Sequence, residues 1–209
     1  MDEKELLGLK SKTTLNCTIC DKCCEHRGDI KITPINVLEI SKYLKIGVEE
    51  FLDKYTEPAP NEDPERVIKA VGEKMRCIFN DNTTFKCTIH EVEPMQCLVF
   101  PLVPWDLNKD LFINSNQCVL KNDKKMKVDK WLNSNHKIYK RNKFIYQKWI
   151  ELMEEIQPWW KIIPKETQGK IVNLLYLEYD MNKNLEKQVL KNIEETRRIF
   201  YGKRHFNRS

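Results

Sequence analysis

Cysteine constrains this chain more than any other residue type, because all eight of its cysteines fall in the first 118 of its 209 residues. The densest group is the string CTICDKCC. The cysteines stand at Cys17, Cys20, Cys23, Cys24, Cys77, Cys87, Cys97 and Cys118. So many thiols in so short a stretch predict that either a metal centre or a set of disulfides organises this part of the fold.

The compartment decides between these two possibilities. The first residues, MDEKELLGLK, are acidic and lack the apolar core of a signal peptide, so we expect no secretory signal and a cytoplasmic protein. The most apolar stretch, Cys97–Trp105, holds two prolines and is far shorter than the roughly 20 residues that cross a bilayer, so we expect no membrane segment. In a reducing compartment eight thiols indicate metal ligation, and we treat all eight as candidate ligands. A disulfide framework, or thiols that serve only as small buried side chains, remain alternatives.

The spacing of the thiols bears on which metal they bind. Thiolates hold Zn²⁺ or iron–sulfur clusters four at a time, so eight can serve two sites, or one site with four to spare. The run Cys17-x2-Cys20-x2-Cys23 has ferredoxin-like spacing, whereas zinc ribbons use two separated pairs, so the run favours a [4Fe–4S] cluster. Zinc is the alternative, because it accepts irregular cysteine sets. Cys24 can face away from Cys23 and serve a different metal.

Charge and hydrophobic periodicity divide the chain near residue 120. Residues 1–120 carry 15 Lys/Arg and 20 Asp/Glu, a net charge of −5, whereas residues 121–209 carry 21 and 11, a net charge of +10. We predict an α+β fold that is mostly α. A small cysteine-rich metal-binding domain with short helices and a β-hairpin spans 1–120, and a basic α-helical part spans 121–209.

Individual elements follow from caps, turns and spacing. Thr33 before Pro34 predicts the start of a helix, and Gly47 its end. The expected elements are a strand at Ile30–Ile32, helices at Pro34–Ile46 and Val48–Tyr55, a hairpin of Arg66–Val71 with Lys74–Phe79, strands at Phe85–Thr88 and Leu111–Asn114, a helical turn at Val92–Cys97, and helices from about Lys125 to before Pro158, at Pro164–Asp180 and at Asn184–Tyr201.

Other polar residues near the thiols are weaker candidates. His26 and His90 could each replace a thiolate or donate a hydrogen bond to one, although a surface histidine is the commoner case. The carboxylates near the first run, which could orient the site, are Asp21, Glu25 and Asp29. The charges of the C-terminal helices are interleaved in sign, which disfavours nucleic-acid binding and leaves these helices as a surface for a protein partner or substrate.

At these positions the sequence resembles the YkgJ-type cysteine-cluster proteins, the CxxCxxCC family described as zinc- or iron-chelating. The resemblance covers about residues 15–120 and excludes the helical C-terminus. It rests on the run Cys17–Cys24, on the segment CTIH that begins with Cys87, on Pro94–Cys97 and on Phe100-Pro101, with Cys77 and Cys118 as the further family cysteines. The chain departs from the family at Glu93 and Gln96, where arginines are usual, and at Asp21-Lys22, where a glycine is usual.

The resemblance implies metal binding first. It also implies a candidate activity, because flagellin lysine N-methylases of the same broad family are thought to combine an iron–sulfur cluster with S-adenosylmethionine. No two of the six glycines are close in sequence, which excludes a Gly-rich Rossmann site for that cofactor. The leading hypothesis is therefore a cytoplasmic [4Fe–4S] protein, with electron transfer or S-adenosylmethionine-dependent methyl transfer as its activity. The alternatives are a zinc-binding structural protein without catalysis and a cluster-dependent protein lysine N-methyltransferase.

Overall fold

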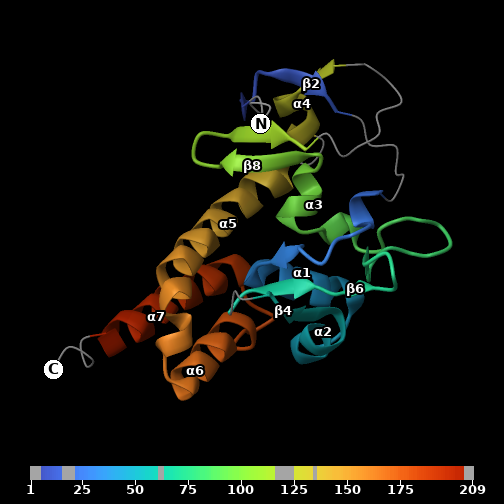
Figure 1. Ribbon diagram of the computed structural model, residues 1–209. Helices are drawn as coiled ribbons and strands as arrows, with labels where there is room; N and C mark the ends of the chain where they lie inside the picture. Colours follow the sequence, from blue (N-terminus) through green and yellow to red (C-terminus); the bar gives the residue numbers. More distant parts are fainter. Residues whose placement is uncertain (1–5, 16–21, 61–63, 116–124, 134–135, 205–209) are drawn as a thin grey trace. The chain divides into compact units, whose positions relative to one another are not determined.

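The computed structural model describes residues 6–15, 22–60, 64–115, 125–133 and 136–204. The chain divides into two compact units, each assembled from two separate segments (Figure 1). Unit 1 comprises Met1–Ile30 and Ala70–Phe144, and unit 2 comprises Lys31–Lys69 and Ile145–Ser209. The boundary near residue 120 that the sequence composition indicates stays a prediction.

Unit 1 is built from short strands and helical turns. In chain order they are β1 (Leu6–Leu7), β2 (Lys12–Thr14), η1 (Lys22–Cys24), β6 (Ala70–Val71), β7 (Arg76–Cys77), η2 (His90–Val92), α3 (Met95–Val99), β8 (Leu102–Asp106), β9 (Leu111–Asn114), β10 (Lys125–Lys127) and α4 (Val128–Asn133). An antiparallel sheet has the strand order β1-β9-β8, while β2 pairs with β10 and β6 with β7. Helix α5 (His136–Ile156) begins in unit 1 and ends in unit 2.

The core of unit 1 lies on one side of its three-stranded sheet. Leu7 and Phe112 face each other across β1 and β9, and both side chains are buried. The ring of Tyr139 on α5 packs against Phe112 with 6.3 Å between centroids, and its hydroxyl donates to Asp110 at 2.8 Å. Each such buried apolar side chain stabilises the fold by roughly 1.5–3 kcal/mol. These contacts fix the start of α5 to the three-stranded sheet within unit 1.

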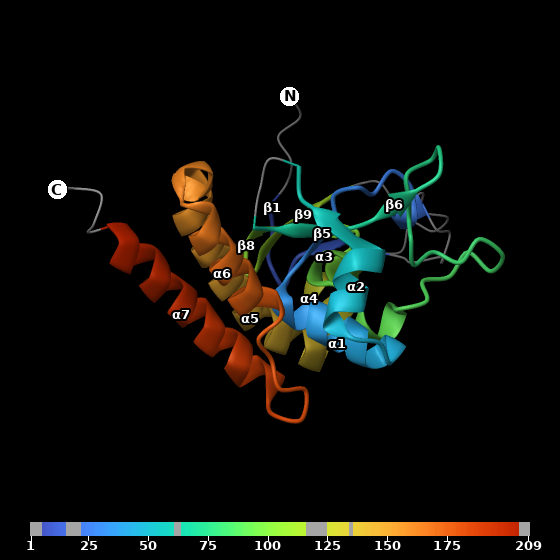
Figure 2. The ribbon, with the colours of Figure 1, turned by 90° about the horizontal axis from the view of Figure 1, so that it is seen from below.

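Unit 2 combines a small sheet with the longest helices. Its elements are β3 (Lys31–Ile32), α1 (Pro34–Leu44), α2 (Val48–Tyr55), β4 (Thr56–Pro58), β5 (Arg66–Ile68), the second part of α5, η3 (Gln157–Ile162), α6 (Lys165–Tyr176) and α7 (Leu185–Arg204). The sheet has the order β3-β5-β4, and α5, α6 and α7 lie side by side (Figure 2). Trp149 of α5 meets Tyr176 of α6 edge to face at 6.0 Å, and both are buried.

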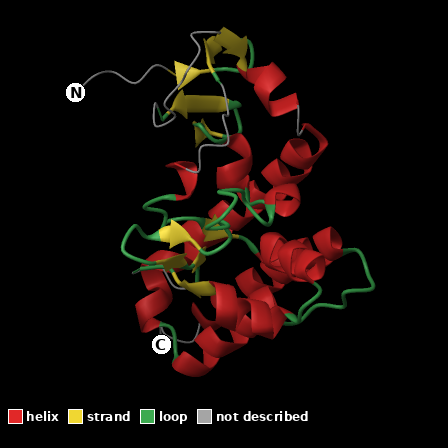
Figure 3. Cartoon of the chain, turned by 90° about the vertical axis from the view of Figure 1, so that its right-hand side faces the viewer, coloured by secondary structure: helices red, strands yellow, loops and turns green. Residues whose placement is uncertain are grey.

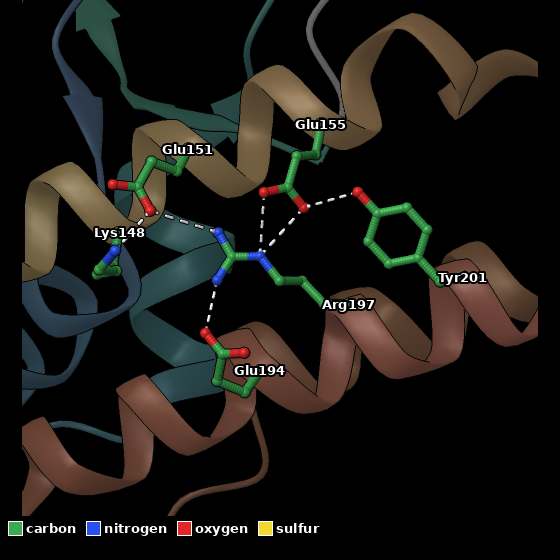
Figure 4. Close-up of polar contacts among 6 residues, drawn as sticks. All are labelled: Lys148, Glu151, Glu155, Glu194, Arg197 and Tyr201. Carbon is green, nitrogen blue, oxygen red and sulfur yellow. Dashed lines mark hydrogen bonds and ion pairs between the residues drawn. The ribbon is translucent and has the colours of Figure 1, made fainter.

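An arginine on α7 ties that helix to α5 within unit 2 (Figure 4). The Nε atom of Arg197 lies 3.1 Å from one oxygen of Glu155 and 3.2 Å from the other. Its two Nη atoms reach Glu194 at 2.5 Å and Glu151 at 3.7 Å. Tyr201 donates to Glu155 at 3.2 Å, so one carboxylate receives hydrogen bonds from two residues of α7.

These elements confirm the predicted α+β, mostly α fold class (Figure 3). Helix α1 starts at Pro34 as expected, with Thr33 donating its N–H to Asn36 at 3.1 Å, and ends where Lys45 takes a φ of 58°. The predicted helix from about Lys125 is wrong at its start, since Lys125–Lys127 pairs as β10 with β2. Among the described helices, none is both long enough and apolar enough to cross a membrane.

Candidate metal centre

The first cysteine turn of unit 1 carries two neighbouring thiols. Cys23 and Cys24 end the short helix η1, and both side chains are half-buried. The thiols are hydrogen bonded to each other, which raises the pKa of Cys23, and burial raises it further. Cys24 therefore influences the Cys23 thiol, and whether Cys24 serves a different metal stays a prediction.

Two backbone hydrogen bonds fix this turn to the loop before Cys77. His26, with a φ of 54°, and Arg27 donate their N–H groups to the carbonyls of Lys74 and Met75, each at 3.0 Å. Met75 itself has a φ of 47°, an unusual value for a residue other than glycine. The left-handed turns on both sides bring the Cys23 segment beside the strand that ends at Cys77.

Cys77 and Cys87 lie at the two ends of a tight loop. Asn80 donates its backbone N–H to the carbonyl of Cys77 at 2.9 Å and forms an isolated β-bridge with Cys87. The loop therefore reverses the chain, so that the segment at Cys87, ten residues later in sequence, returns to the segment at Cys77. A backbone hydrogen bond from Phe79 lowers the pKa of the Cys77 thiol, and one from Ile89 lowers that of Cys87. In each case the N–H group belongs to the residue two positions after the cysteine, and such N–H groups stabilise a thiolate ligand.

The third segment is α3, which carries Cys97. Pro94 is its N-cap residue, and its carbonyl accepts hydrogen bonds from the N–H groups of Cys97 and Leu98, each at 2.9 Å. Burial raises the pKa of the Cys97 thiol well above its ordinary value of 9.0. The Phe100-Pro101 peptide bond that follows α3 is cis.

The thiols of these three segments influence one another electrostatically. Each of Cys23, Cys77, Cys87 and Cys97 interacts electrostatically with at least two of the others, so that one thiolate raises the pKa of its neighbours. Burial is the larger cause at the last three, and it raises the pKa of Cys87 from 9.0 to about 11. Thiols gathered in this way stay protonated at neutral pH until a cation replaces their protons.

Arg27 is a charged neighbour of the thiols that sequence reasoning missed. Its positive charge lowers the pKa of Cys23, Cys77 and Cys97. Its side chain is only 15% exposed, with Nη1 3.5 Å from the carbonyl of Cys23 and Nε 2.6 Å from Asp29. The only sequence signal was its place three residues after Cys24. At Glu93 and Gln96 this chain lacks the arginines that are usual in the family it resembles. The guanidinium of Arg27 supplies a cationic group near the thiols instead.

Glu93 is a carboxylate neighbour of two of these thiols. Burial raises the pKa of Glu93, opposed by His90, whose Nδ1 lies 3.1 Å away. The carboxylate in turn raises the pKa of Cys97 and Cys87, so it lies near both thiols. His90 is an exposed partner of Glu93.

The remaining sequence candidates are distributed as follows. Cys17, Cys20, Cys118 and Asp21 lie outside the described residues, and their roles stay predictions. Glu25 and Asp29 bind arginines, Arg76 at 2.6 Å and Arg27 at 2.6 Å. His26 is exposed.

The donor set fits a metal centre. All five described cysteines are free thiols, and thiolates are the soft ligands of zinc and of iron–sulfur clusters. Backbone N–H groups and Arg27 are placed to offset the negative charge that four thiolates would carry. Within the described residues alone, no three Cys, His, Asp or Glu side chains are already arranged to hold a single metal ion.

The fold and this thiol group define a metal-binding protein of the cysteine-cluster class. Residues 16–136 match the family model described as "CxxCxxCC: Putative zinc- or iron-chelating domain". The match covers more than half of the chain, so the chain belongs to this family, as its cysteine pattern predicted.

One curated relative extends the comparison. An uncharacterized protein from Methanocaldococcus jannaschii is 35% identical over 86 residues, which is 41% of this chain and 43% of that protein. The chain therefore matches less than half of that relative's length. No solved structure matches the chain.

Proposed function

We propose that this chain is an iron–sulfur protein and that Cys23, Cys77, Cys87 and Cys97 take part in holding a [4Fe–4S] cluster. The observation that carries the proposal is the mutual electrostatic coupling of these thiols, which come from three separate segments of unit 1. Buried thiols gathered without a metal leave their sulfur atoms poorly solvated, and a cation compensates that cost.

A cluster is favoured over a single zinc ion by the number and spacing of thiols. A structural zinc site is closed by four ligands. The chain holds eight cysteines, and Cys23 ends a run with the spacing that ferredoxins use. The backbone N–H groups that bind the sulfur atoms of Cys77 and Cys87 suit either metal, and in a cluster they raise its reduction potential.

The ligand set also bears on activity. A cluster with one thiolate on each iron is closed and suits electron transfer. Methyl transfer from S-adenosylmethionine requires an iron that lacks a protein ligand. Electron transfer is therefore the activity we propose, and a change in the cluster's electron paramagnetic resonance spectrum on adding S-adenosylmethionine would contradict it.

The test is metal analysis of protein purified without oxygen. Iron, acid-labile sulfide and zinc are measured per chain in the wild type, in Cys77→Ser and Cys87→Ser, and in Ser41→Ala. Ser41 is a matched control, because it is a small, fully buried side chain in unit 2. We expect iron and sulfide in the wild type and in Ser41→Ala, and a loss of both in the cysteine variants. Stoichiometric zinc without sulfide would instead support the structural zinc protein.

A further inference from the structure

We propose that Arg76 is a positioning residue of the metal centre, which holds the turn carrying Cys23 and Cys24 against the strand and loop carrying Cys77 and Cys87. The inference rests on the proposed function, because it concerns the same site. It adds a residue outside the thiols that should decide how tightly the metal is held.

Arg76 contacts all three parts of this arrangement. It precedes Cys77 in β7, and its side chain is only 18% exposed. Its Nη2 atom donates to Glu25 Oε1 at 2.6 Å, and its Nη1 atom donates to Asn80 Oδ1 at 2.9 Å. Its guanidinium also lies over the ring of Phe85, 5.6 Å from the centroid.

Each of these partners is joined to a cysteine. Glu25 directly follows Cys24 in sequence. Asn80 donates to the carbonyl of Cys77 and pairs with Cys87. Phe85 stands two residues before Cys87, in a left-handed turn of the same loop with a φ of 57°. One guanidinium therefore restrains two candidate metal-binding segments, the turn that carries Cys23 and Cys24 and the loop between Cys77 and Cys87.

The chemistry of the side chain explains why arginine is suited to this place. A guanidinium is planar and has five N–H donors, so it can bind a carboxylate, bind an amide and stack on an aromatic ring at the same time. A lysine ammonium keeps the ion pair but lacks the planar face and the fixed fork of donors. Arg76→Lys should therefore retain part of the function, and Arg76→Met should retain none of it.

Removal of Arg76 should loosen the centre without unfolding unit 1. The hydrogen bonds from His26 and Arg27 to Lys74 and Met75 join the same segments through the backbone, and the substitution does not remove them. Lys74 also lies 3.6 Å from Glu25, which leaves that carboxylate a cationic neighbour.

Arg197 provides a matched control in unit 2. It is an arginine with nearly the same exposure, 16%, and it likewise binds carboxylates of its own unit (Figure 4). Arg197→Met should lower the free energy of unfolding by an amount comparable to Arg76→Met. The two variants should differ in metal retention, because only Arg76 contacts the cysteine segments.

The experiment measures the rate at which a chelator removes iron from anaerobically purified protein, with urea unfolding of the metal-free protein beside it. We expect iron release about tenfold faster in Arg76→Met, an intermediate rate in Arg76→Lys, and a rate within about twofold of wild type in Arg197→Met. Glu25→Gln should also release iron faster and supplies the test if Arg76→Met fails to fold.

Three results would overturn the inference. Wild-type protein that holds metal while Arg76→Met releases it at the wild-type rate would reject the role of Arg76 and leave the proposed function standing. If Arg197→Met released iron as fast as Arg76→Met, the faster release would reflect a lower overall stability and not a role of Arg76 at the metal centre. Wild-type protein that holds no metal would reject the proposed function and this inference together.

Discussion

Metal binding to the thiol group should depend steeply on pH. Cys23, Cys77, Cys87 and Cys97 all have pKa values raised above the ordinary 9.0, so in metal-free protein all four should be protonated around neutral pH. A metal that binds the four thiolates must release one proton from each. The apparent association constant should then rise by about four decades per pH unit, or about 5 kcal/mol of binding free energy.

The structure also predicts where this dependence ends. Thiols with the ordinary pKa of 9.0 would lose their protons near pH 9, and the dependence would flatten there. Burial raises the pKa of Cys87 to about 11, so its proton should still be released on binding at pH 9.5. The steep region should therefore extend above pH 9.

Zinc is a suitable probe for this measurement, because it binds thiolates without redox chemistry. Its affinity is measured by competition with a coloured chelator whose own protonation is known, and the released protons are counted with a pH indicator in weak buffer. Cys87→Ala should lower the slope by about one decade per pH unit, whereas Ser41→Ala should leave it unchanged. A slope near one, or a slope unaffected by Cys87→Ala, would refute the convergence of the four thiols.

Further predictions concern stability and charge, and urea unfolding tests the first three. Arg197→Met should lower the free energy of unfolding by about 1–3 kcal/mol, because it removes the guanidinium that Glu151, Glu155 and Glu194 share. The 78% exposed Arg198 is the contrast, and Arg198→Met should change that free energy by less than about 0.5 kcal/mol. Trp149→Ala should cost about 3–5 kcal/mol, because its ring is buried against α6. In metal-free protein the protonated Cys87 thiol favours the folded state below pH 9, and this contribution is lost as the pH rises to about 11, so the wild type should lose about 2 kcal/mol more than Cys87→Ala over that window. Arg27→Gln should raise the thiol pKa values further and weaken zinc binding at pH 7, and Arg27→Lys should restore it; equal affinity in both variants would contradict an electrostatic role.

Local signals in the sequence predicted the parts of the fold that depend on neighbouring residues. Thr33 and Pro34 mark the start of α1, and Pro158 the end of α5, because caps and proline act within one helical turn. The strand Leu111–Asn114 is confirmed with its bounds as β9. These elements can be predicted without information about distant residues.

The pairing of strands from distant segments was harder to predict from the sequence. Arg66–Ile68 was expected to pair with Lys74–Phe79, but as β5 it pairs with β3 and β4. The expected hairpin is reduced to β6 and β7 around Gly72, whose φ is 71°. A short run of apolar residues indicates that a strand can form, but it does not indicate which other strand it pairs with.

The same distinction holds for the site. The cysteine pattern identified the family and the candidate ligands, because thiols at such density are rare outside metal centres. It did not reveal Arg27 or Arg76, because an arginine looks alike in sequence whether it is solvated or turned toward a thiol. The left-handed turns at Met75 and Phe85, which join the cysteine segments, carry no glycine that would have marked them.

Anaerobic metal analysis with thiol titration tests the central claim most directly, namely that separate segments of this chain share one metal centre. The account predicts about four iron and four sulfide per chain, with Cys23, Cys77, Cys87 and Cys97 protected from alkylation until the metal is removed. Folded protein that contains no metal, in which all these thiols are alkylated at the rate of exposed cysteine, would contradict it.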